Sequence, residues 1–494
     1  MPSKIKQCVR NESSEVVSLL LSAKKKKKKN NEDEDIATSS SQNDFSEANI
    51  IRDEINETEN EIYSSEENDN AELLINNADI KRDLAIWSVK HTISNSAINE
   101  LLIILRKTFP YLPRDARTLK QTPRDAPITQ IQGGNYVHYG LRDCLTDFLS
   151  QTTYLNDIID LNISIDGLPV AKSSLAQAWP ILININGTEA VQTVGIYSGN
   201  SKPKDVNEFI QPFVDELREL MNENFAYKNK IYKINCRAII CDAPARSLLM
   251  GIKSHTGYSS CHKCNQRGEH INHRMVFKFQ KNSTLRTDES FRQRSDTNFH
   301  KEFNHMAIED LSVDLIKSFP MDYMHVVCLG VVKTLMNAWI QKKNQPYSLT
   351  NQNIVHLNDQ LLFLKGKLPR EFRRSTRDLK EFERYKATEF RTFLLYVGPF
   401  VLKTVLDEKR YLHFLQLSLS MRILLDSKQC QTNNRCADEL LQSFVKLLPE
   451  YYDASISVYN FHCLTHLAND CLLYGSSETI SAFKFENKLG ILKR

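Results

Sequence analysis

Two aspartates stand where apolar segments end, a position at which a carboxylate needs a partner. Asp166 ends the alternating segment NISID, and Asp242 ends the nearly apolar INCRAIICD. Burying an ionised carboxylate costs free energy that a bound cation offsets, and Mg²⁺ prefers oxygen ligands. If the two strand ends lie side by side, the pair and a third acid could hold two Mg²⁺ (or Mn²⁺) ions that act on a phosphodiester.

Each aspartate alone also has an ordinary structural explanation. Asp166 and Gly167 form a common hairpin-turn dipeptide, and Asp242 precedes APAR, where it would cap the start of a helix. The order of the surrounding elements favours the metal-binding interpretation of the pair.

A Cys-x-x-Cys pair follows the second aspartate and supplies half of a tetrahedral zinc site, which needs four ligands. One pair of histidines is close in sequence, and a distant pair lies one helical turn apart on one face of an expected helix. The two candidate ligand sets are Cys261 and Cys264 with either His270 and His273 or His462 and His466.

The elements expected to position these residues alternate between strand and helix. Strands are predicted over 160–167, 178–186, 190–199 and 234–242, with amphipathic helices over 206–225 and from residue 243. Three antiparallel strands, a helix and a parallel fourth strand bring both aspartates to neighbouring strand ends. The expected fold is therefore a ribonuclease-H-like mixed α/β sheet, interrupted by a large helical insertion.

Composition and periodicity divide the chain into five predicted segments. They are a disordered low-complexity tail (1–75), a helical region with a linker (76–152), the first part of the sheet core (153–260), a mainly helical, zinc-tied insertion (261–473) and a final, truncated core helix (474–494).

The 494 residues, 41% hydrophobic and 25% charged with a net charge of +4, are ordinary for a soluble protein. The run Lys24–Lys29 is either a nuclear or nucleic-acid-binding segment or a solvated tail. No signal peptide and no membrane-length apolar run is present. Eleven scattered cysteines without a secretion signal favour reduced thiols in the cytosol or nucleus.

Four segments together resemble DDE transposases of the CACTA type and their insect relatives, and the order of parts is similar to the catalytic subunit of the V(D)J recombinase. The segments are SIDGLPVAKSSLAQAWPIL, AIICDAPARSLLMGIKSHTGYSSCHKC, FPMDYMHVVCLGVVKTL and SAFKFENKLG. The resemblance covers roughly residues 80–494 and is carried by the order and spacing of short motifs.

Transferred position by position, the resemblance implies roles for nine residues. Asp166, Asp242 and Glu486 would be the catalytic acids that bind Mg²⁺, Asp322 and His325 the motif between the second and third acids, and Cys261, Cys264, His462 and His466 the zinc ligands. A zinc site at both ends of the insertion would hold Glu486 over the other acids. Glu478 is the nearest rival for the third acid.

The resemblance also implies a nuclear enzyme that acts on transposon ends and target DNA as a homo-oligomer, with no membrane association. His325 would contact or shield the scissile phosphate, and the backbone contacts would come from Lys253, Arg267, Arg274 and Lys278, which could equally form a solvated face. The alternative is a non-catalytic descendant that binds DNA or protein, favoured by the lack of a recognisable end-binding domain and by the short sequence after Glu486.

Overall fold

The computed structural model describes residues 80–493 apart from short gaps at 90, 92, 123–126, 172–173, 282, 303, 370 and 373. The predicted disordered tail and the run Lys24–Lys29 lie outside the described residues. What is described falls into two compact units, a smaller one up to Pro127 and a larger one from Ile128 onward.

The smaller unit is helical. It contains a helix over 80–89, α3 (Asn95–Leu105) and α4 (Ala116–Leu119). Side chains close the helix starts, since Ser94 accepts a hydrogen bond from the amide of Ala97 and Asp115 accepts one from Arg117. Its buried core consists of Ile98, Leu102, Leu112, Ala116 and Leu119.

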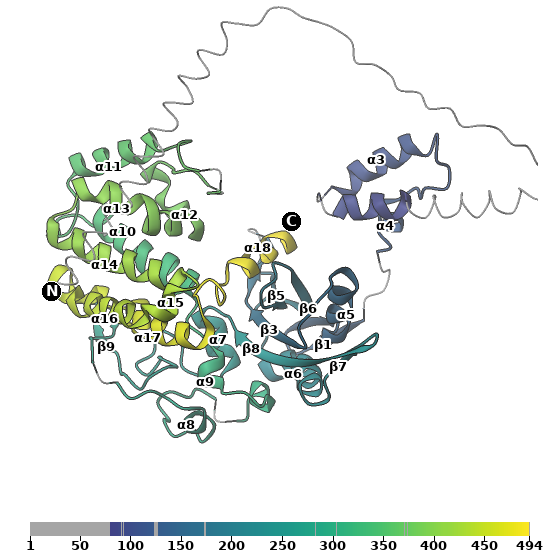
Figure 1. The fold of residues 1–494 in the computed structure, drawn as a ribbon, viewed down its shortest axis with the longest axis horizontal. Coiled ribbons are helices and arrows are strands. Elements are labelled where there is room, and N and C mark those ends of the chain that lie inside the picture. The colour runs from purple at the N-terminus through teal and green to yellow at the C-terminus, as the bar shows by residue number, and fades with distance from the viewer. Residues whose placement is uncertain are drawn as a thin grey trace, which may run out of the picture. The chain divides into compact units, whose positions relative to one another are not determined.

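A mixed sheet organises the first part of the larger unit (Figure 1). Its strands are β1 (Ile128–Ile131), β2 (Gly134–His138), β3 (Ile158–Ile165), β4 (Leu168–Pro169), β5 (Gln177–Ile185), β6 (Val191–Gly199), β7 (Phe225–Tyr227) and β8 (Lys230–Ile239). They follow the spatial order β1-β2-β6-β5-β3-β8-β7, with β4 paired to β5. The β3–β8 pair is parallel and the other pairs are antiparallel.

Each face of the sheet is covered by different helices, because successive side chains of a strand point to opposite faces. Ile181, Ile183 and Ile185 pack in one cluster with α5 (Leu141–Gln151) and α6 (Val206–Glu223). Leu182 lies in a separate cluster with Phe485 and Leu489 of α18 (Phe483–Leu492). The helix that carries Glu486 is therefore packed on the sheet, and Figure 1 shows it in yellow beside β5.

The sheet begins earlier than the sequence predicts. The predicted core starts at residue 153, but β1 and β2 form a hairpin that pairs with β6, so the boundary moves from 152/153 to Ile128. The physical reason is the turn at Gly133, which has φ +97° and lets two short strands reverse within a segment otherwise assigned to the linker.

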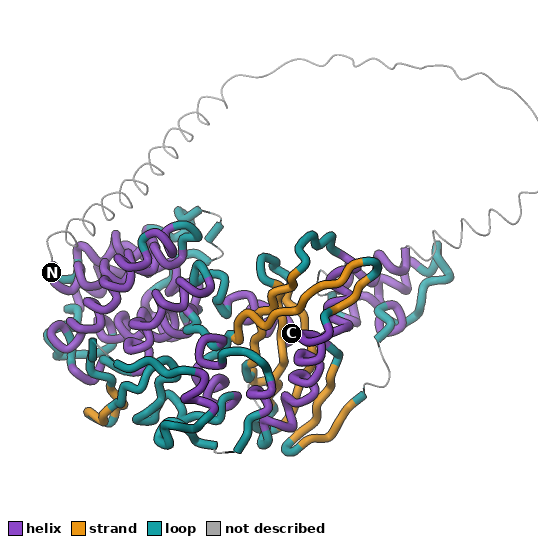
Figure 2. The backbone as a smooth tube through the Cα atoms, turned by 60° about the horizontal axis from the view of Figure 1, so that its bottom comes forward, coloured by secondary structure: helices purple, strands orange, loops and turns teal. Residues whose placement is uncertain are grey.

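Long helices form the remainder of the larger unit, and Figure 2 shows them gathered on one side and the strands of the sheet on the other. The elements that connect sheet and helices are α7 (Ala243–Leu249), β9 (Glu269–Ile271), β10 (Arg274–Val276), α8 (Asp288–Arg292), a short helix over Ala307–Asp310 and α9 (Leu315–Ser318). The helical part contains η2 (Met324–Val332), α10 (Lys333–Ile340), α11 (Asn351–Phe363), a short helix over Leu379–Arg384, α12 (Ala387–Thr392), η4 (Phe393–Val397), α13 (Gly398–Val401), a short helix over Leu402–Thr404, α14 (Glu408–Leu425), α15 (Gln429–Thr432), α16 (Asn434–Tyr451), a short helix over Ala454–Ile456 and α17 (Tyr459–Tyr474).

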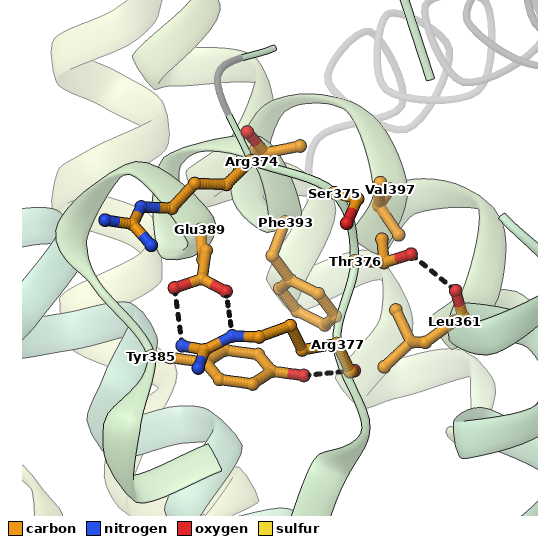
Figure 3. A pocket seen from close by; sticks show the side chains of 10 residues that line it. Leu361, Arg374, Ser375, Thr376, Arg377, Tyr385, Glu389, Phe393 and Val397 are labelled. Atoms are coloured by element: carbon orange, nitrogen blue, oxygen red, sulfur yellow. Dashed lines mark hydrogen bonds and ion pairs between the residues drawn. The ribbon is translucent and has the colours of Figure 1, made fainter. Parts of the chain in front are cut away.

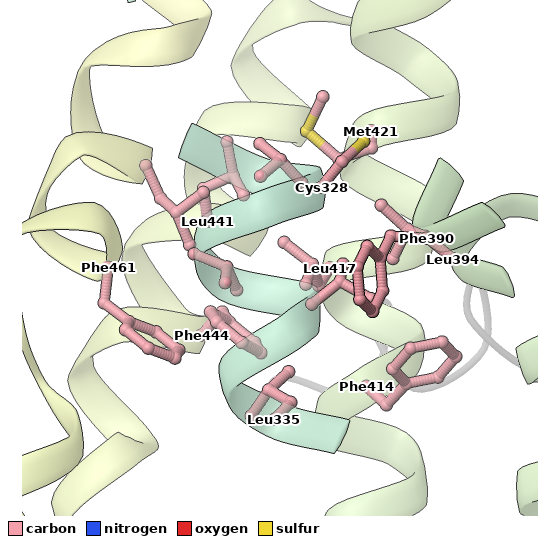
Figure 4. Packing of buried hydrophobic residues seen from close by; sticks show 14 of the residues in the cluster. Cys328, Leu335, Phe390, Leu394, Phe414, Leu417, Met421, Leu441, Phe444 and Phe461 are labelled. Atoms are coloured by element: carbon pink, nitrogen blue, oxygen red, sulfur yellow. The ribbon is translucent and has the colours of Figure 1, made fainter. Parts of the chain in front are cut away.

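The continuous helix η2–α10 occupies the centre of this helical part. Cys328 and Leu335 on it lie among buried side chains of the surrounding helices, including Phe414 of α14 and Phe444 of α16 (Figure 4). The segment η2 is a π-helix, a rare form that is frequently found at functional sites. Among the described residues, no helix is long and apolar enough to cross a bilayer.

Candidate functional site

The parallel pairing of β3 with β8 brings Asp166 and Asp242 to neighbouring strand ends. Ile163 stands opposite Ile239 in this register, and three further positions along each strand lead to the two aspartates. The amide of Ile240 continues the pairing by donating to the carbonyl of Ile163 at 2.7 Å. The sequence-based expectation about the two strand ends is thus met by the topology.

Three side chains from distant segments converge at this edge. Asp166, His325 and Glu486 each offer one ligand atom within 4.8 Å of the other two, and we call them the Asp–His–Glu cluster. The His325 Nε2 atom lies 3.9 Å from Glu486 Oε1. All three side chains are half-buried, which leaves the cluster open to a ligand from solvent.

Asp242 stands beside this cluster as a helix cap. One of its carboxylate oxygens accepts a hydrogen bond from the amide of Ala245 at 2.7 Å and closes the start of α7. One oxygen of Asp242 therefore has the structural role of a helix cap. Its charge nonetheless acts on the cluster, because it contributes to the raised pKa of Asp166.

Burial and neighbouring carboxylates raise the pKa values of both acids of the cluster. Burial, then the charges of Asp242 and Glu486, raise the pKa of Asp166 to about 7 against the opposing effect of His325. Burial also raises the pKa of Glu486. Burial alone would lower the pKa of His325, but its hydrogen bond to Asp322 and the nearby carboxylates raise it to about 9. A cation bound here would relieve the repulsion among the carboxylates.

Asp322 positions two parts of the cluster, the His325 ring and the helix that carries Glu486. It is buried, and its Oδ2 atom accepts from His325 Nδ1 at 2.6 Å, so the Nε2 atom is left to face Glu486. Its Oδ1 atom accepts from the amide of Ala482 at 2.9 Å, directly before α18. One carboxylate thus orients the histidine and holds the helix of Glu486, a double role that the sequence motif did not reveal.

Further contacts attach α18 and the segment before it to the sheet. Arg237 of β8 donates to the carbonyl of Tyr474 at 2.5 Å and to Thr479 Oγ1 at 3.0 Å, and Lys484 donates to the carbonyl of Thr188 at 2.7 Å. Glu478, the rival third acid, instead forms an ion pair with Arg391 at 2.9 Å. Of the two glutamates, only Glu486 belongs to the Asp–His–Glu cluster.

The two cysteines meet the distant histidines, and these four residues form the Cys2His2 cluster. Cys261, Cys264, His462 and His466 are all buried, and their ligand atoms lie within 4.8 Å of one another. The nearer histidines of the alternative ligand set, His270 and His273, are exposed on the β9–β10 hairpin.

The spacing within the Cys2His2 cluster suits a tetrahedral metal ion. Cys261 Sγ lies 3.5 Å from His466 Nε2, Cys264 Sγ lies 3.4 Å from His462 Nε2, and the two nitrogens are 3.3 Å apart. Zinc bonds of roughly 2.3 Å to sulfur and 2.0–2.1 Å to nitrogen place tetrahedral ligands about 3.5 Å (S to N) and about 3.3 Å (N to N) apart. The cluster could therefore bind a metal such as zinc.

The electrostatics of the Cys2His2 cluster favour a thiolate. Burial alone would raise the pKa of the Cys261 thiol, but the hydrogen bond from Cys264 and the two histidines lower it well below its usual value. The thiolate is the form of cysteine that binds metals.

Side chains outside the ligand set hold the cluster in place, and sequence reasoning missed them. Arg286 Nε lies 3.0 Å from the carbonyl oxygens of both Cys261 and Cys264, which fixes the turn between them. The ring of Phe277 stacks on His462 with centroids 5.2 Å apart. No short motif marks either residue, since both act through tertiary contacts.

The basic residues predicted to hold phosphates all lie in the segment between α7 and α8. Lys278 pairs with Glu269 at 2.5 Å, and Arg267 lies over the ring of Tyr258 at 5.5 Å from its centroid. Lys253 is half-buried and Arg274 is exposed on β10. Their role in binding a backbone stays a prediction.

A small pocket elsewhere in the helical part contains none of the predicted site residues. Arg374, Thr376, Tyr385 and Phe393 are among its lining residues (Figure 3). The Arg377 guanidinium forms two hydrogen bonds with Glu389, at 2.6 and 2.7 Å. Because these charges satisfy each other, the pocket offers less chemistry than the Asp–His–Glu cluster.

Neither the models of known protein families nor the curated proteins give a match to this chain.

Proposed function

We propose that the chain is a transposon-derived DDE transposase that cuts and joins DNA phosphodiester bonds by two-metal-ion catalysis. The observation that carries this proposal is the Asp–His–Glu cluster, in which Asp166, His325 and Glu486 meet from three distant segments. Asp242 adds a fourth charged group at the neighbouring strand end.

The arrangement of the sheet supports a ribonuclease-H-like core. The spatial order β6-β5-β3-β8 is that of three antiparallel strands followed by a parallel fourth. That order matches the expectation from the sequence, in which the aspartates end the first and fourth strands of the core.

The carboxylates of Asp166, Asp242 and Glu486 are the proposed ligands for Mg²⁺ or Mn²⁺. Divalent ions at such a site supply an activated oxygen nucleophile and neutralise charge on the phosphodiester. Asp242 retains a second oxygen beyond the one that caps α7.

The proposed role of His325 is to contact the scissile phosphate. Asp322 fixes its ring, and against the effect of burial the hydrogen bond to Asp322 raises the pKa of His325, which favours the imidazolium. An imidazolium that is oriented before the substrate arrives would stabilise phosphate charge without rearranging.

The Cys2His2 cluster is the proposed zinc site, with a structural role. It connects the segment after α7 to α17, the two ends of the predicted insertion. A structural zinc site contributes directly to folding free energy, so the metal would hold the helical part in a fixed relation to Glu486. The proposal has three further parts, which rest on the resemblance alone. They are nuclear localisation, transposon ends and target DNA as substrates, and assembly of the chain as a homo-oligomer on DNA.

The test is metal-dependent cleavage and strand transfer on branched or end-like DNA. Asp242→Asn is a sharper variant than Asp242→Ala, because asparagine caps a helix about as well as aspartate. We expect it to remove activity that requires Mg²⁺ or Mn²⁺ while leaving stability unchanged. DNA binding without cleavage in the unmodified chain would favour the non-catalytic alternative, and cleavage without joining would indicate a nuclease.

A further inference from the structure

A buried ion pair connects the two clusters. Lys263 stands between the two cysteines of the Cys2His2 cluster, and its Nζ atom lies 2.9 Å from Asp470 Oδ1. We infer that Lys263 and Asp470 are positioning residues that couple metal binding at the Cys2His2 cluster to the geometry of the Asp–His–Glu cluster. This inference rests on the proposed function in one respect, that the second cluster takes a divalent cation.

The first part of the connection lies on α17. His462, His466 and Asp470 recur every four residues along this helix, so they lie on one face. That face meets the Cys-x-x-Cys loop twice, through the Cys2His2 cluster and through Lys263. The side chains of the ion pair are only 9% and 7% exposed.

The loop is also attached to the segment that leads to Asp322. Lys263 donates to the carbonyl of Ile316 at 3.0 Å, and His262 Nε2 lies 2.8 Å from the carbonyl of Phe319. Both anchors are buried. The loop between the cysteines therefore contacts both α17 and the segment approaching the Asp–His–Glu cluster.

The second part of the connection passes through Asp470. While one oxygen pairs with Lys263, the other accepts from the amide of Met321 at 2.7 Å. Met321 precedes Asp322, which orients His325 and binds the amide of Ala482 ahead of α18. A continuous set of polar contacts thus runs from the cysteine loop to the helix of Glu486.

The chemistry of the pair suits a coupling role. A buried ion pair offers little net stability compared with an apolar pair, whereas removing one partner leaves a costly unpaired charge. Asp470 instead connects three segments, namely α17, the loop between the cysteines and the segment at Met321. Substituting residues that orient metal ligands typically changes metal affinity by about 10–100-fold.

The experiment uses the full chain with Co²⁺ at the Cys2His2 cluster, whose absorption spectrum reports that cluster. Mn²⁺ binding is followed by electron paramagnetic resonance, with Asp166→Asn defining the binding that belongs to the Asp–His–Glu cluster. Asp470→Asn and Lys263→Met should keep the Co²⁺ spectrum and weaken this Mn²⁺ binding by about tenfold. The combined variant should weaken Mn²⁺ binding by less than the product of the two single effects, because the two residues share one contact.

A matched control separates coupling from general stability. Arg294 and Glu309 form another largely buried ion pair, with no contact to either cluster among those described. Glu309→Gln should lower the unfolding temperature and leave Mn²⁺ affinity unchanged.

Hydrogen exchange supplies a readout that does not depend on the proposed chemistry. Chelating the metal of the Cys2His2 cluster should speed exchange across 482–490, and Asp470→Asn should show the faster exchange with that metal still bound. If the unmodified chain binds no Mn²⁺ through Asp166, the proposed function fails while this comparison still tests the coupling. The inference is overturned if both variants match the unmodified chain in exchange and Mn²⁺ affinity. It is equally overturned if both lose the Co²⁺ spectrum, because the pair then serves the Cys2His2 cluster alone.

Discussion

The proposed role of Glu486 can be tested directly, because Glu478 is a nearby glutamate that serves as a control. We expect Glu486→Gln to reduce Mg²⁺-dependent DNA cleavage by about 100-fold or more, since it removes a carboxylate ligand of the proposed ions. Cleavage rates measured beside zinc content and DNA binding check this. Glu478→Gln breaks the ion pair with Arg391 and should leave cleavage nearly intact. The opposite pattern would show that Glu478 is the third acid.

Asp322 should matter for stability as much as for the site. The buried carboxylate accepts from the His325 ring and from the amides of Met324, His325 and Ala482. Asp322→Ala leaves these donors without their acceptor, and we expect a loss of at least about 3 kcal/mol in the free energy of unfolding. Urea titration measures it. Asp359→Ala, at an exposed position of α11, should change the same quantity by less than about 0.5 kcal/mol.

At the scale of elements, Glu216 of α6 holds α5 and β2 together. It accepts from the amide of Leu141 at 2.6 Å, from that of Arg142 at 2.9 Å, and from His138 Nε2 at 2.9 Å. Burial alone would raise the pKa of Glu216, but these hydrogen bonds lower it below 4.5 overall. A lowered carboxyl pKa stabilises the fold above pH 4.5, and that stabilisation disappears as the pH falls through the folded-state value.

The resulting prediction concerns the pH dependence of unfolding. Glu216→Gln should lower the thermal unfolding temperature at neutral pH, and the difference from the unmodified chain should shrink as the pH falls below about 4.5. Thermal melts across this range measure it. Glu219→Gln, one turn away in an exposed pair with Arg142, should have little effect at any pH. A deficit that persists unchanged in acid would show that Glu216 acts by packing alone.

The close approach of η2 to α17 depends on Gly330. A Cβ atom at this position would lie 2.5 Å from Asn460 Nδ2 and 2.9 Å from Asn460 Cβ. Gly330→Ala should therefore cost about 1–3 kcal/mol of unfolding free energy, and adding Asn460→Ala should recover part of it. Gly490→Ala, where nothing lies within 4 Å of the new Cβ, should instead be neutral or stabilising, because alanine favours a helix over glycine. Denaturant unfolding of the four proteins would decide.

At the scale of the whole molecule, the Cys2His2 cluster should govern whether the helical part keeps its structure. We expect one zinc ion per chain by metal analysis, lost in Cys261→Ser and in His466→Ala. Chelation should lower the unfolding temperature, because binding energy at a structural zinc site is folding energy. His270→Ala and His273→Ala should keep both the zinc and the stability. Loss of zinc in those variants would show that His270 and His273 are zinc ligands.

Much of this arrangement could be predicted because it depends on periodicity and strand order. Strands that lead to Asp166 and Asp242 and a helix from Val206 follow from alternation and amphipathic spacing. The ligand histidines could be proposed because an i, i+4 pair marks one face of a helix. The ion pair between Lys263 and Asp470 of α17 could not be predicted, since two residues so far apart in the sequence leave no local pattern.

The hairpin β1–β2 and the cap at Asp242 show the other limits. Short strands at the edge of a sheet gain their stability from pairing with β6, which no local window of the sequence displays. Whether an aspartate caps a helix or faces a ligand depends on its rotamer, and one carboxylate can take part in both.

The parallel β3–β8 pairing also has a consequence during synthesis of the chain. Domains fold from the N-terminal side as the ribosome adds about 5–20 residues per second, and Glu486 follows Asp242 by 244 positions (486 − 242). About 10 to 50 s therefore separate translation of the two acids. During that time a nascent chain contains both aspartates, but without α18 it lacks the third carboxylate. The cutting chemistry proposed for this protein would stay switched off on the ribosome until the helical part has been made and closed over the sheet.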